Sequence, residues 1–461
     1  MIRSHILASL RTIAGKEHVF TSKEDRITYS YDGTPLHDHL PEAIVRPATK
    51  EQISEIVKLA NVEQFKIVPR GAGSGLSGGS IPVENCIVMD LSQWNKILEI
   101  DAENLTAWVE PGVITSQLHQ QVEKLGLFYP PDPGSMNICT IGGNVAENSG
   151  GLRGLKYGVT KNYVMGMEVV LPNGEIIVCG GKTVKDVAGY NLKDLFIGSE
   201  GTLGIFTKIL LKLIPKPETS KTMVAYFNTQ ADAGKTVSAI IAQKIIPCTV
   251  EFLDKITINC VEDFSKIGLP RDIESLLLLE VDGNASVVEE EAAKVAECCR
   301  QNNAVEVKIA QTVEEAMRLK TARRSAFSAL ARFRPTTILE DITVPRSEIA
   351  VMLEKIAAIS KKYDVLIGTF GHAGDGNLHP TCLTDERNHE EIARAEKAYE
   401  EIFIEAVKLG GTITGEHGTG LAKKKFLHLV TGNAAIETMR AVKKAMDPNG
   451  ILNPGKIFDL A

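Results

Sequence analysis

Three stretches rich in glycine and small polar residues constrain the fold of this 461-residue chain most strongly. They read PRGAGSGLSGG from Pro69, TIGGNVAENSGG from Thr140 and GSEGTLGI from Gly198. Glycine lets a backbone approach a ligand closely, and asparagine and serine supply hydrogen bonds. Three such loops within one domain indicate an extended ligand, larger than a mononucleotide.

The first of these loops is a candidate phosphate site. Gly73, Gly75 and Gly78 match the spacing G-x-G-x-x-G, but the dinucleotide-binding fold requires a helix to begin at the loop. Here a strand is expected at 65–68 and another at 86–90, with no helix between them. The loop is therefore predicted to form a nest of backbone N–H groups that binds an anion, with a glycine-rich surface turn as the alternative.

A second feature lies near the C-terminus, where GHAGDGNLH begins at Gly371 and GEHG begins at Gly415. Three of the ten histidines fall in these two segments. A lone histidine is ordinarily a packed or solvated residue, but His372 and His379 together with a carboxylate form a ligand set with open positions for water or substrate. The set suits Zn²⁺, Mn²⁺ or Fe²⁺ acting as a Lewis acid. If Glu416 is the third ligand, His417 is the expected general base.

Composition excludes several classes of protein. A net charge of −7 gives no broad attraction to nucleic acid, and no apolar run approaches the roughly 20 residues that span a bilayer. No secretion signal is recognised at the N-terminus. The eight cysteines show no C-x-x-C spacing, which predicts reduced thiols, a cytoplasmic location and no iron–sulfur cluster within the chain itself.

The pattern of expected helices and strands changes at Pro215-Lys216-Pro217, which marks a domain boundary. Earlier, helices are expected at 51–61 and 113–125, and a hairpin at 97–109. Later, strands and helices alternate up to residue 410, and two final helices follow His417. The expected strands of this second part are 223–227, 249–253, 276–281, 305–309, 338–344 and 365–370, and its helices include 285–302 and 346–363. The charged runs at 289–291 and 423–425 are predicted to be solvated helix faces.

The order of the motifs PRGAGSGLSGG, PPDPGS, TIGGNVAENSGG and LKDLFIGSEGTLGI resembles the FAD-binding domain of the vanillyl-alcohol-oxidase, or PCMH-type, flavoprotein superfamily. GHAGDGNLH, GEHGTG and the closing ILNPGK resemble the branch that contains glycolate oxidase catalytic subunits, D-lactate dehydrogenases and D-2-hydroxyglutarate dehydrogenases. The resemblance implies an α+β fold in three parts. These are a PCMH-type FAD-binding domain at 1–215, an α+β cap for substrate and metal at 216–410, and a C-terminal segment at 411–461 that completes the active site and returns to the FAD domain.

The resemblance also assigns residues to the cofactor. FAD is expected to bind non-covalently, because relatives with tethered flavin have a histidine in the first loop and this loop has none. The pyrophosphate would lie against Arg70, Gly71, Ala72, Gly73, Ser74, Gly75, Ser77 and Gly78. The adenosine and isoalloxazine would lie against Pro133, Gly134, Ser135, Gly142, Gly143, Asn144, Asn148, Gly151, Glu200, Gly201, Gly204 and Ile205, and Asn453 would touch the flavin region.

By the same resemblance Arg323 is the clamp for a substrate carboxylate, the alternative being a surface arginine in an ion pair. Phe327 and Leu339 stand where relatives that accept a second carboxylate have polar side chains, which favours a small monocarboxylate. The implied reaction is FAD-dependent oxidation of a D-2-hydroxy acid such as D-lactate or glycolate, with hydride transfer to flavin N5. His372, His379 and Glu416 would hold the metal, and His417 would remove the hydroxyl proton.

The sequence does not determine the electron acceptor, and it is compatible with two other functions. An electron-transferring flavoprotein, an iron–sulfur subunit and a quinone-linked route are all compatible with the resemblance, as is a homodimer. One alternative function is a non-redox flavoenzyme of the alkylglycerone-phosphate-synthase type. The other is a flavin-carrying structural subunit of an oxidase complex, against which the joint presence of metal ligands and a base argues.

Overall fold

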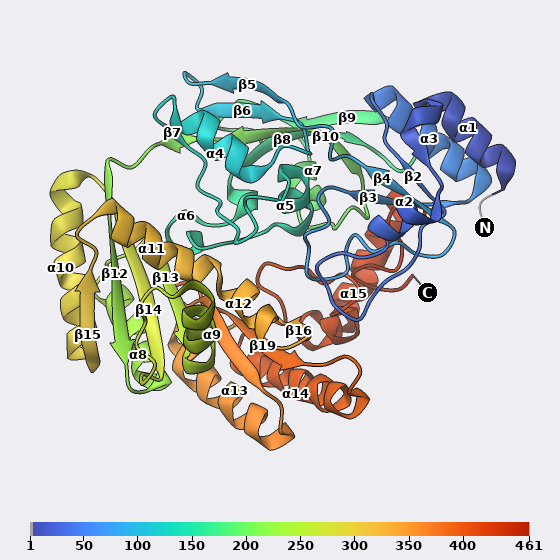
Figure 1. Cartoon of the computed structure of the whole chain (residues 1–461). Coiled ribbons are helices and arrows are strands. Elements are labelled where there is room, and N and C mark those ends of the chain that lie inside the picture. Colours follow the sequence, from blue (N-terminus) through green and yellow to red (C-terminus); the bar gives the residue numbers. More distant parts are fainter. Residues whose placement is uncertain (1–2, 461) are drawn as a thin grey trace. The chain divides into compact units, whose positions relative to one another are not determined.

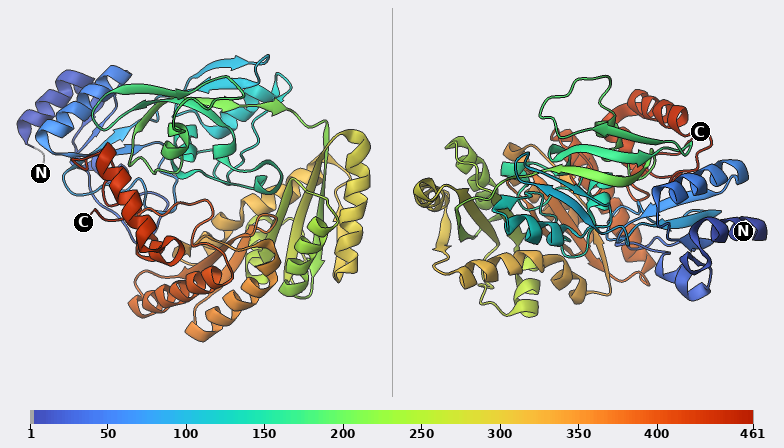
Figure 2. Two further views of the ribbon diagram at one scale, coloured as in Figure 1. Left: turned by 180° about the vertical axis from the view of Figure 1, so that it is seen from behind. Right: turned by 90° about the horizontal axis from the view of Figure 1, so that it is seen from above.

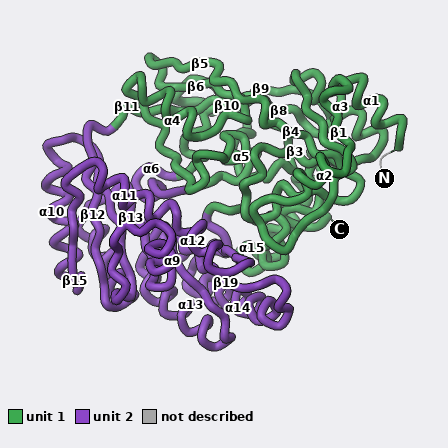
Figure 3. The backbone as a smooth tube through the Cα atoms, in the orientation of Figure 1, with its two compact units in different colours: residues 1–149, 159–216, 416–461 green, residues 150–158, 217–415 purple. Residues whose placement is uncertain are grey.

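The structure, a computed structural model, describes residues 3–460 and divides into two compact units (Figure 3). Unit 1 comprises residues 1–149, 159–216 and 416–461, and unit 2 comprises residues 150–158 and 217–415. The short segment 150–158 therefore packs with unit 2, whereas the sequence placed it in the first domain. The chain returns to unit 1 at Glu416, directly after Gly415.

One half of unit 1 is a four-stranded sheet in the order β1-β2-β4-β3, whose last three strands are parallel (Figure 1). The strands are β1 (Val19–Phe20), β2 (Ala43–Val45), β3 (Lys66–Arg70) and β4 (Cys86–Asp90). Helices α1 (Ser4–Ala14) and α3 (Lys50–Glu63) pack on it through fully buried side chains such as Leu10, Ile53 and Ile56. Ile451 and Leu452 join the same core, so the end of the chain is fixed to this sheet.

The other half of unit 1 is a five-stranded antiparallel sheet in the order β5-β6-β10-β8-β9. The predicted hairpin is confirmed as β5 (Ile97–Asp101) and β6 (Thr106–Val109). The other strands are β8 (Val164–Val170), β9 (Ile176–Gly180) and β10 (Ile205–Lys212), and β7 (Leu127–Phe128) pairs with β11 (Ile214–Pro215). The remaining helices are η1 (Lys16–His18), α2 (Lys23–Thr28), α4 (Thr115–Glu123), α5 (Ile141–Glu147), η2 (Thr160–Asn162), α7 (Leu192–Phe196), η4 (Lys424–Phe426) and α15 (Leu427–Met446).

Helix α5 corrects the prediction that the second glycine-rich stretch is a loop. The Thr140 side chain caps the helix by accepting the Gly143 N–H at 3.2 Å. A Cβ atom at Gly142 would lie 2.9 Å from the carbonyl oxygen of Pro111, so this glycine allows close packing of the helix. The helix ends where Asn148 adopts a left-handed conformation with φ 54°.

Unit 2 is built on one eight-stranded antiparallel sheet in the order β15-β12-β14-β13-β18-β19-β16, with β17 also paired to β19. Its strands are β12 (Thr219–Phe227), β13 (Thr249–Asp254), β14 (Ser275–Gly283), β15 (Ala304–Ile309), β16 (Thr336–Leu339), β17 (Ile342–Thr343), β18 (Ile367–His372) and β19 (Asn377–Thr384). The central strand β13 is buried along its whole length, which places its side chains inside the unit.

Helices cover the sheet of unit 2 in two groups that can be followed in Figures 1 and 2. One group packs side by side and consists of α8 (Gln230–Ala242), α10 (Ala285–Gln301), α13 (Ile349–Tyr363) and α14 (His389–Lys408). The other consists of α9 (Lys255–Ser265), α11 (Val313–Arg324) and α12 (Ala326–Phe333). Two short elements, α6 (Gly154–Tyr157) and η3 (Arg346–Glu348), complete the unit.

One expected strand of unit 2 is divided in the structure. The predicted strand at 338–344 is two short strands, β16 and β17, separated at Glu340 and Asp341, where the Asp341 side chain is fully buried. The helix that carries Arg323 is α11, which ends at Arg324, where the Ser325 hydroxyl donates back to the Ala322 carbonyl at 2.9 Å.

The lysine run at 423–425 was predicted to be a solvated face, and this is wrong for its first member. Lys423 is only 1% exposed. The N–H groups of Leu421 and Ala422 both donate to the Ser77 carbonyl, which holds this segment inside unit 1. The two final helices are present as two parts of α15, because Gly432 breaks the helical backbone with φ 71°. Between residues 3 and 460, no helix has the length and apolarity needed to cross a membrane.

Candidate flavin cradle and metal centre

The three glycine-rich stretches come together in unit 1. The N–H groups of Gly198 and Glu200 donate to the carbonyls of Val145 and Ala146, both at 2.9 Å. The Asn453 side chain donates to the carbonyls of Gly79 and Glu200 at 2.8 and 2.7 Å. Hydrogen bonds therefore hold these segments, which are far apart in sequence, next to one another.

The first loop has the backbone features of an anion cradle. It follows β3, and the chain between Gly71 and Asn85 contains no helix, as predicted. A Cβ atom at Gly71 would overlap the Thr140 hydroxyl, and one at Gly73, where φ is +66°, would overlap the Arg70 guanidinium. Arg70 itself is 7% exposed, and burial lowers its pKa. An anion beside this loop would offset the cost of burying that positive charge.

Buried charges lie directly behind the loop. Burial raises the pKa of Glu200 to about 7. The pKa of Glu147 is also well above its ordinary value because of burial and, second, the charge of Glu200. Lys423 and Lys456 face this pair, and burial lowers the pKa of Lys456 to about 8.

The other residues predicted for the cofactor lie on the same elements or next to them. Pro133, Gly134 and Ser135 form a turn between β7 and α5. The Asn144 side-chain amide donates a hydrogen bond to the Thr115 hydroxyl at 2.8 Å, and the Asn148 side chain accepts the Lys161 N–H at 2.9 Å. Ala72, Ser74, Gly75, Ser77 and Gly78 lie in the first loop, Gly201 and Gly204 precede β10, Ile205 begins β10, and Gly151 belongs to unit 2.

In unit 2 the two histidines of the GHAGDGNLH motif face one another across a hairpin. His372 ends β18 and His379 lies in β19, which pairs with β18 in antiparallel register. Their ring centroids are 5.2 Å apart with perpendicular planes, and a ring nitrogen of each lies within 4.8 Å of the other. Two imidazoles at this spacing could share one metal ion.

Each histidine has a fully buried carboxylate behind it. Glu251 Oε1 lies 2.7 Å from His372 Nδ1, and Asp341 Oδ1 lies 3.7 Å from His379 Nδ1. A carboxylate next to the second ring nitrogen is typical of metal-ligating histidines, since it fixes the tautomer and the ring orientation. The arrangement of the donor atoms therefore fits a metal site.

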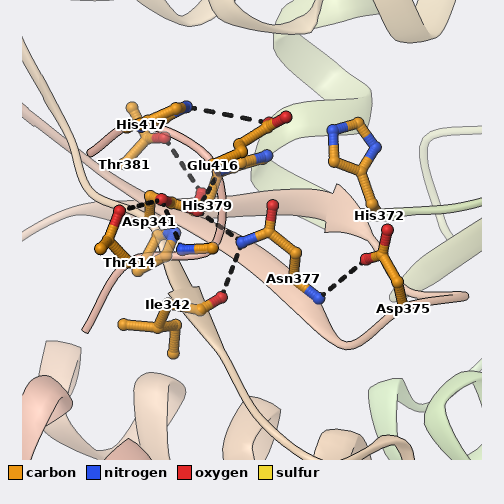
Figure 4. Close-up of polar contacts among 12 residues, drawn as sticks. Asp341, Ile342, His372, Asp375, Asn377, His379, Thr381, Thr414, Glu416 and His417 are labelled. Carbon is orange, nitrogen blue, oxygen red and sulfur yellow. Dashed lines mark hydrogen bonds and ion pairs between the residues drawn. The ribbon is translucent and has the colours of Figure 1, made fainter. Parts of the chain in front are cut away.

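Asp341 also anchors the segment that leads to the predicted third ligand. Its carboxylate accepts hydrogen bonds from the Asn377 amide, the Thr414 hydroxyl and the Gly415 N–H, the last two at 2.8 Å (Figure 4). Glu416 is joined to Gly415 by one peptide bond. Within unit 1, His417 Nε2 lies 3.9 Å from Glu416 Oε1. The predicted base and the predicted carboxylate ligand therefore have neighbouring side chains.

Arg323 is a buried residue, which excludes the alternative of a surface arginine. Its Nε lies 2.5 Å from Glu251 Oε2, and its guanidinium lies over the Phe370 ring at 4.8 Å from the centroid. Its Nη2 is buried without a hydrogen-bond partner among the residues that the structure describes. A buried guanidinium with an unused donor is suited to bind a carboxylate.

Comparisons with known proteins identify the family. Residues 41–180 match the family described as FAD binding domain, and residues 216–457 match FAD linked oxidases, C-terminal domain. The chain is 55% identical over 458 residues to glycolate oxidase subunit GlcD of Bacillus subtilis strain 168, covering 99% of this chain and 97% of that protein. The chain belongs to the FAD-linked oxidase family.

Further relatives of this FAD-linked oxidase are consistent with that assignment. A D-lactate dehydrogenase of Anaerostipes hadrus is 35% identical over 470 residues, covering 99% of this chain and 98% of that protein. The solved structure of p-cresol methylhydroxylase matches with a TM-score of 0.82 at 22% identity, covering 99% and 97% of the two chains. An alkyldihydroxyacetonephosphate synthase structure matches with a TM-score of 0.77 at 20% identity, covering 98% and 86%. At these identities the two structures show the fold alone.

The predicted α+β, PCMH-type fold is therefore confirmed, and the protein is an FAD-linked oxidoreductase. Sequence reasoning missed the roles of three buried charged residues and of half-buried Glu147 in this oxidoreductase. Glu147 is the sole charged residue of its glycine-rich stretch and Asp341 ends the Glu340-Asp341 pair, so both could have been noticed. Glu251 lies in an apolar strand and Lys423 in a lysine run, and neither carries a local signal.

Proposed function

We propose that this FAD-linked oxidase converts a small D-2-hydroxy acid, D-lactate or glycolate, to the corresponding 2-oxo acid. The observation that carries the proposal is the arrangement of Arg323, Glu251, His372 and His379 in unit 2, which combines a buried carboxylate-binding group with a pair of metal-type imidazoles. The names of the relatives, glycolate oxidase subunit and D-lactate dehydrogenase, support the same substrate class.

FAD would be held without a covalent bond by the first loop and the segments that meet it. The fit rests on Gly71 and Gly73, whose missing side chains let the loop lie close to Thr140 and Arg70, and on the buried charge of Arg70. When bound, flavin supplies the acceptor for the substrate hydride at N5. The protein contributes the backbone N–H groups of the loop, which suit the negatively charged pyrophosphate.

A divalent metal, Zn²⁺, Mn²⁺ or Fe²⁺, would be held by His372, His379 and Glu416. The nitrogen–nitrogen–oxygen donor set and the carboxylates behind both rings support it. A metal in this position supplies Lewis acidity, which lowers the pKa of a hydroxyl group. Asp341 keeps Gly415, and with it the backbone that precedes Glu416, in place.

Arg323 and His417 would act on the substrate itself. The unused Nη2 donor of Arg323 binds the substrate carboxylate and fixes the orientation of the α-carbon. His417 accepts the hydroxyl proton as the C–H bond breaks. Half-buried Phe327 and buried Leu339 supply no charge for a second carboxylate, which favours a monocarboxylate.

Electrons would then leave the reduced flavin for a separate acceptor protein. The eight cysteines are free thiols spread over both units, and the B. subtilis relative is named as a subunit, which supports a partner within a complex. An electron-transferring flavoprotein or an iron–sulfur subunit would fit this role.

The test is anaerobic bleaching of the flavin absorbance of the purified protein by D-lactate, L-lactate, glycolate and D-2-hydroxyglutarate. It is performed before and after EDTA treatment, with Zn²⁺, Mn²⁺ or Fe²⁺ added back. We expect rapid bleaching by D-lactate or glycolate that EDTA abolishes and one metal restores. If none of the four acids bleaches the flavin of metal-loaded protein, the hydroxy-acid assignment is wrong.

A further inference from the structure

Glu251 is a charged residue inside a strand that is buried along its whole length. It lies in the middle of β13, between β14 and β18, and its side chain is 0% exposed. Carboxylates are almost never fully buried unless they are paired. Burying one costs several kcal/mol in general, so its partners must offset the loss of solvation.

The two carboxylate oxygens of Glu251 serve two different partners. Oε1 lies 2.7 Å from His372 Nδ1, and Oε2 lies 2.5 Å from Arg323 Nε. His372 comes from the neighbouring strand β18, where the register Phe252 to Gly371 puts Glu251 opposite His372 one step further along. Arg323 comes from the last turn of α11. One side chain therefore connects two elements of unit 2 at the site.

The hydrogen bond between Glu251 and His372 determines which ring nitrogen of His372 can bind a metal. The carboxylate accepts a hydrogen bond from Nδ1–H, which keeps its proton, so the ring lone pair lies on Nε2. The ion pair between Glu251 and Arg323 likewise fixes the position of the guanidinium. Nε is paired to Glu251 and the guanidinium lies over the Phe370 ring, and the buried Nη2, which has no hydrogen-bond partner among residues 3–460, is a donor that another anion can use.

We propose that Glu251 is a positioning residue that fixes both the metal ligand His372 and the carboxylate clamp Arg323. Binding of the substrate hydroxyl through the metal and binding of the substrate carboxylate through Arg323 then both depend on Glu251. This inference rests on the proposed function. It adds a residue that binds neither metal nor substrate and that couples the two binding events.

The decisive variant is Glu251→Gln. An amide is uncharged and offers one acceptor oxygen, so Gln can accept the hydrogen bond from His372 but loses the ion pair with Arg323, towards which it would turn its NH₂ group. Glu251→Asp, which keeps the charge but is one methylene shorter, serves as a second variant should Gln prevent folding. The matched control is Glu280→Gln on β14. Glu280 forms an ion pair at 2.5 Å with Lys320, which lies on α11 one turn before Arg323. This control therefore removes a carboxylate that pairs with the same helix but not with His372 or Arg323.

Two binding readouts separate positioning from mere stabilisation. Metal affinity is measured by titrating EDTA-treated, FAD-loaded protein with Zn²⁺, Mn²⁺ and Fe²⁺ against a chromogenic chelator. Substrate binding is measured as the KM for D-lactate and glycolate. We expect Glu251→Gln to weaken metal binding by about 10- to 100-fold and to raise the KM by about tenfold or more. His372→Ala should weaken metal binding, and Arg323→Lys should raise the KM with unchanged metal affinity.

The outcomes distinguish this inference from the proposed function. If wild-type protein binds metal and oxidises either acid, but Glu251→Gln matches Glu280→Gln in both readouts, Glu251 is only a structural residue and the inference is overturned. If Glu251→Gln changes one readout without the other, the coupling is wrong. If wild-type protein binds none of the three metals, the metal part of the proposed function fails, and the inference fails with it.

Discussion

The carboxylate of Glu200 accepts the backbone N–H of Thr419 at 2.7 Å, two residues after His417. Its second oxygen accepts the Gly420 N–H at 2.8 Å. Glu200 was predicted to bind the cofactor, yet its side chain is used to hold the segment that follows the proposed base. A contribution of this residue to FAD binding would therefore come from its backbone, which adopts a left-handed conformation with φ 51°.

The buried pair Glu147 and Glu200 predicts a specific pH dependence of stability. Burial raises the pKa of Glu200 from 4.5 to about 7, and the pKa of Glu147 is raised in the same direction. The folded protein thus binds protons that the unfolded chain releases. The free energy of unfolding should decrease as pH rises from about 4.5 to about 7 through these two groups.

Glu147→Gln removes one of the two charges, so the pKa of Glu200 should move towards its ordinary value and the pH dependence should flatten. Asp32, Lys423 and Lys456 are the other charged groups that face the pair, and they remain unchanged. Urea denaturation between pH 5 and 8 measures the effect. A variant whose stability falls with pH as steeply as that of wild-type protein would contradict the assignment.

Gly71→Ala should reduce FAD occupancy. A methyl group at this position would overlap the Thr140 hydroxyl, which caps α5 by accepting the Gly143 N–H. Loss of such a cap typically costs about 1 kcal/mol, and the first loop would also be displaced. The flavin-to-protein absorbance ratio after purification measures occupancy. Gly181→Ala is the control, because nothing lies within 4 Å of a Cβ there. Equal occupancy in the two variants would refute the cradle.

Asp341→Asn should weaken metal binding by about 10- to 100-fold. Asp341 accepts from Asn377, Thr414 and Gly415, and an amide cannot accept all three hydrogen bonds with the same geometry. Chelator competition with the purified protein measures the loss. Asp254→Asn is a matched control, since this buried carboxylate of the same unit accepts the N–H groups of Thr257 and Thr369 at 2.8 and 2.7 Å. Similar affinity in both variants would argue against a role for Asp341 at the metal.

His417→Ala should lower turnover by about 10²- to 10⁴-fold, because general-base catalysis contributes a factor of this size. The flavin spectrum and the metal content should stay unchanged, since His417 is assigned to neither group. His428→Ala is the control, because His428 is exposed, its Nδ1 lies 2.9 Å from the Lys425 carbonyl oxygen, and it is assigned to neither the flavin nor the metal. Near-normal turnover of His417→Ala would show that another group removes the proton.

Local patterns were sufficient to predict the main parts of this protein. The glycine spacing of the first loop, the hairpin at 97–109 and the strand at 86–90 depend on neighbouring residues, and the structure contains them. The two histidines of GHAGDGNLH are close because an antiparallel hairpin connects them directly. Short-range backbone geometry can be read from sequence because few other residues influence it.

Only the tertiary structure decided which buried charges meet. Glu251 and His372 are 121 residues apart, and Glu200 and Thr419 are 219 apart, so no sequence period relates them. The helix at Thr140 and the burial of Lys423 likewise depend on Pro111 and Ser77, which lie elsewhere in the chain. A buried charge is stable only where distant elements bring it a partner, and this is why the sequence determined the loops and the histidine pair while the fold determined their supporting carboxylates.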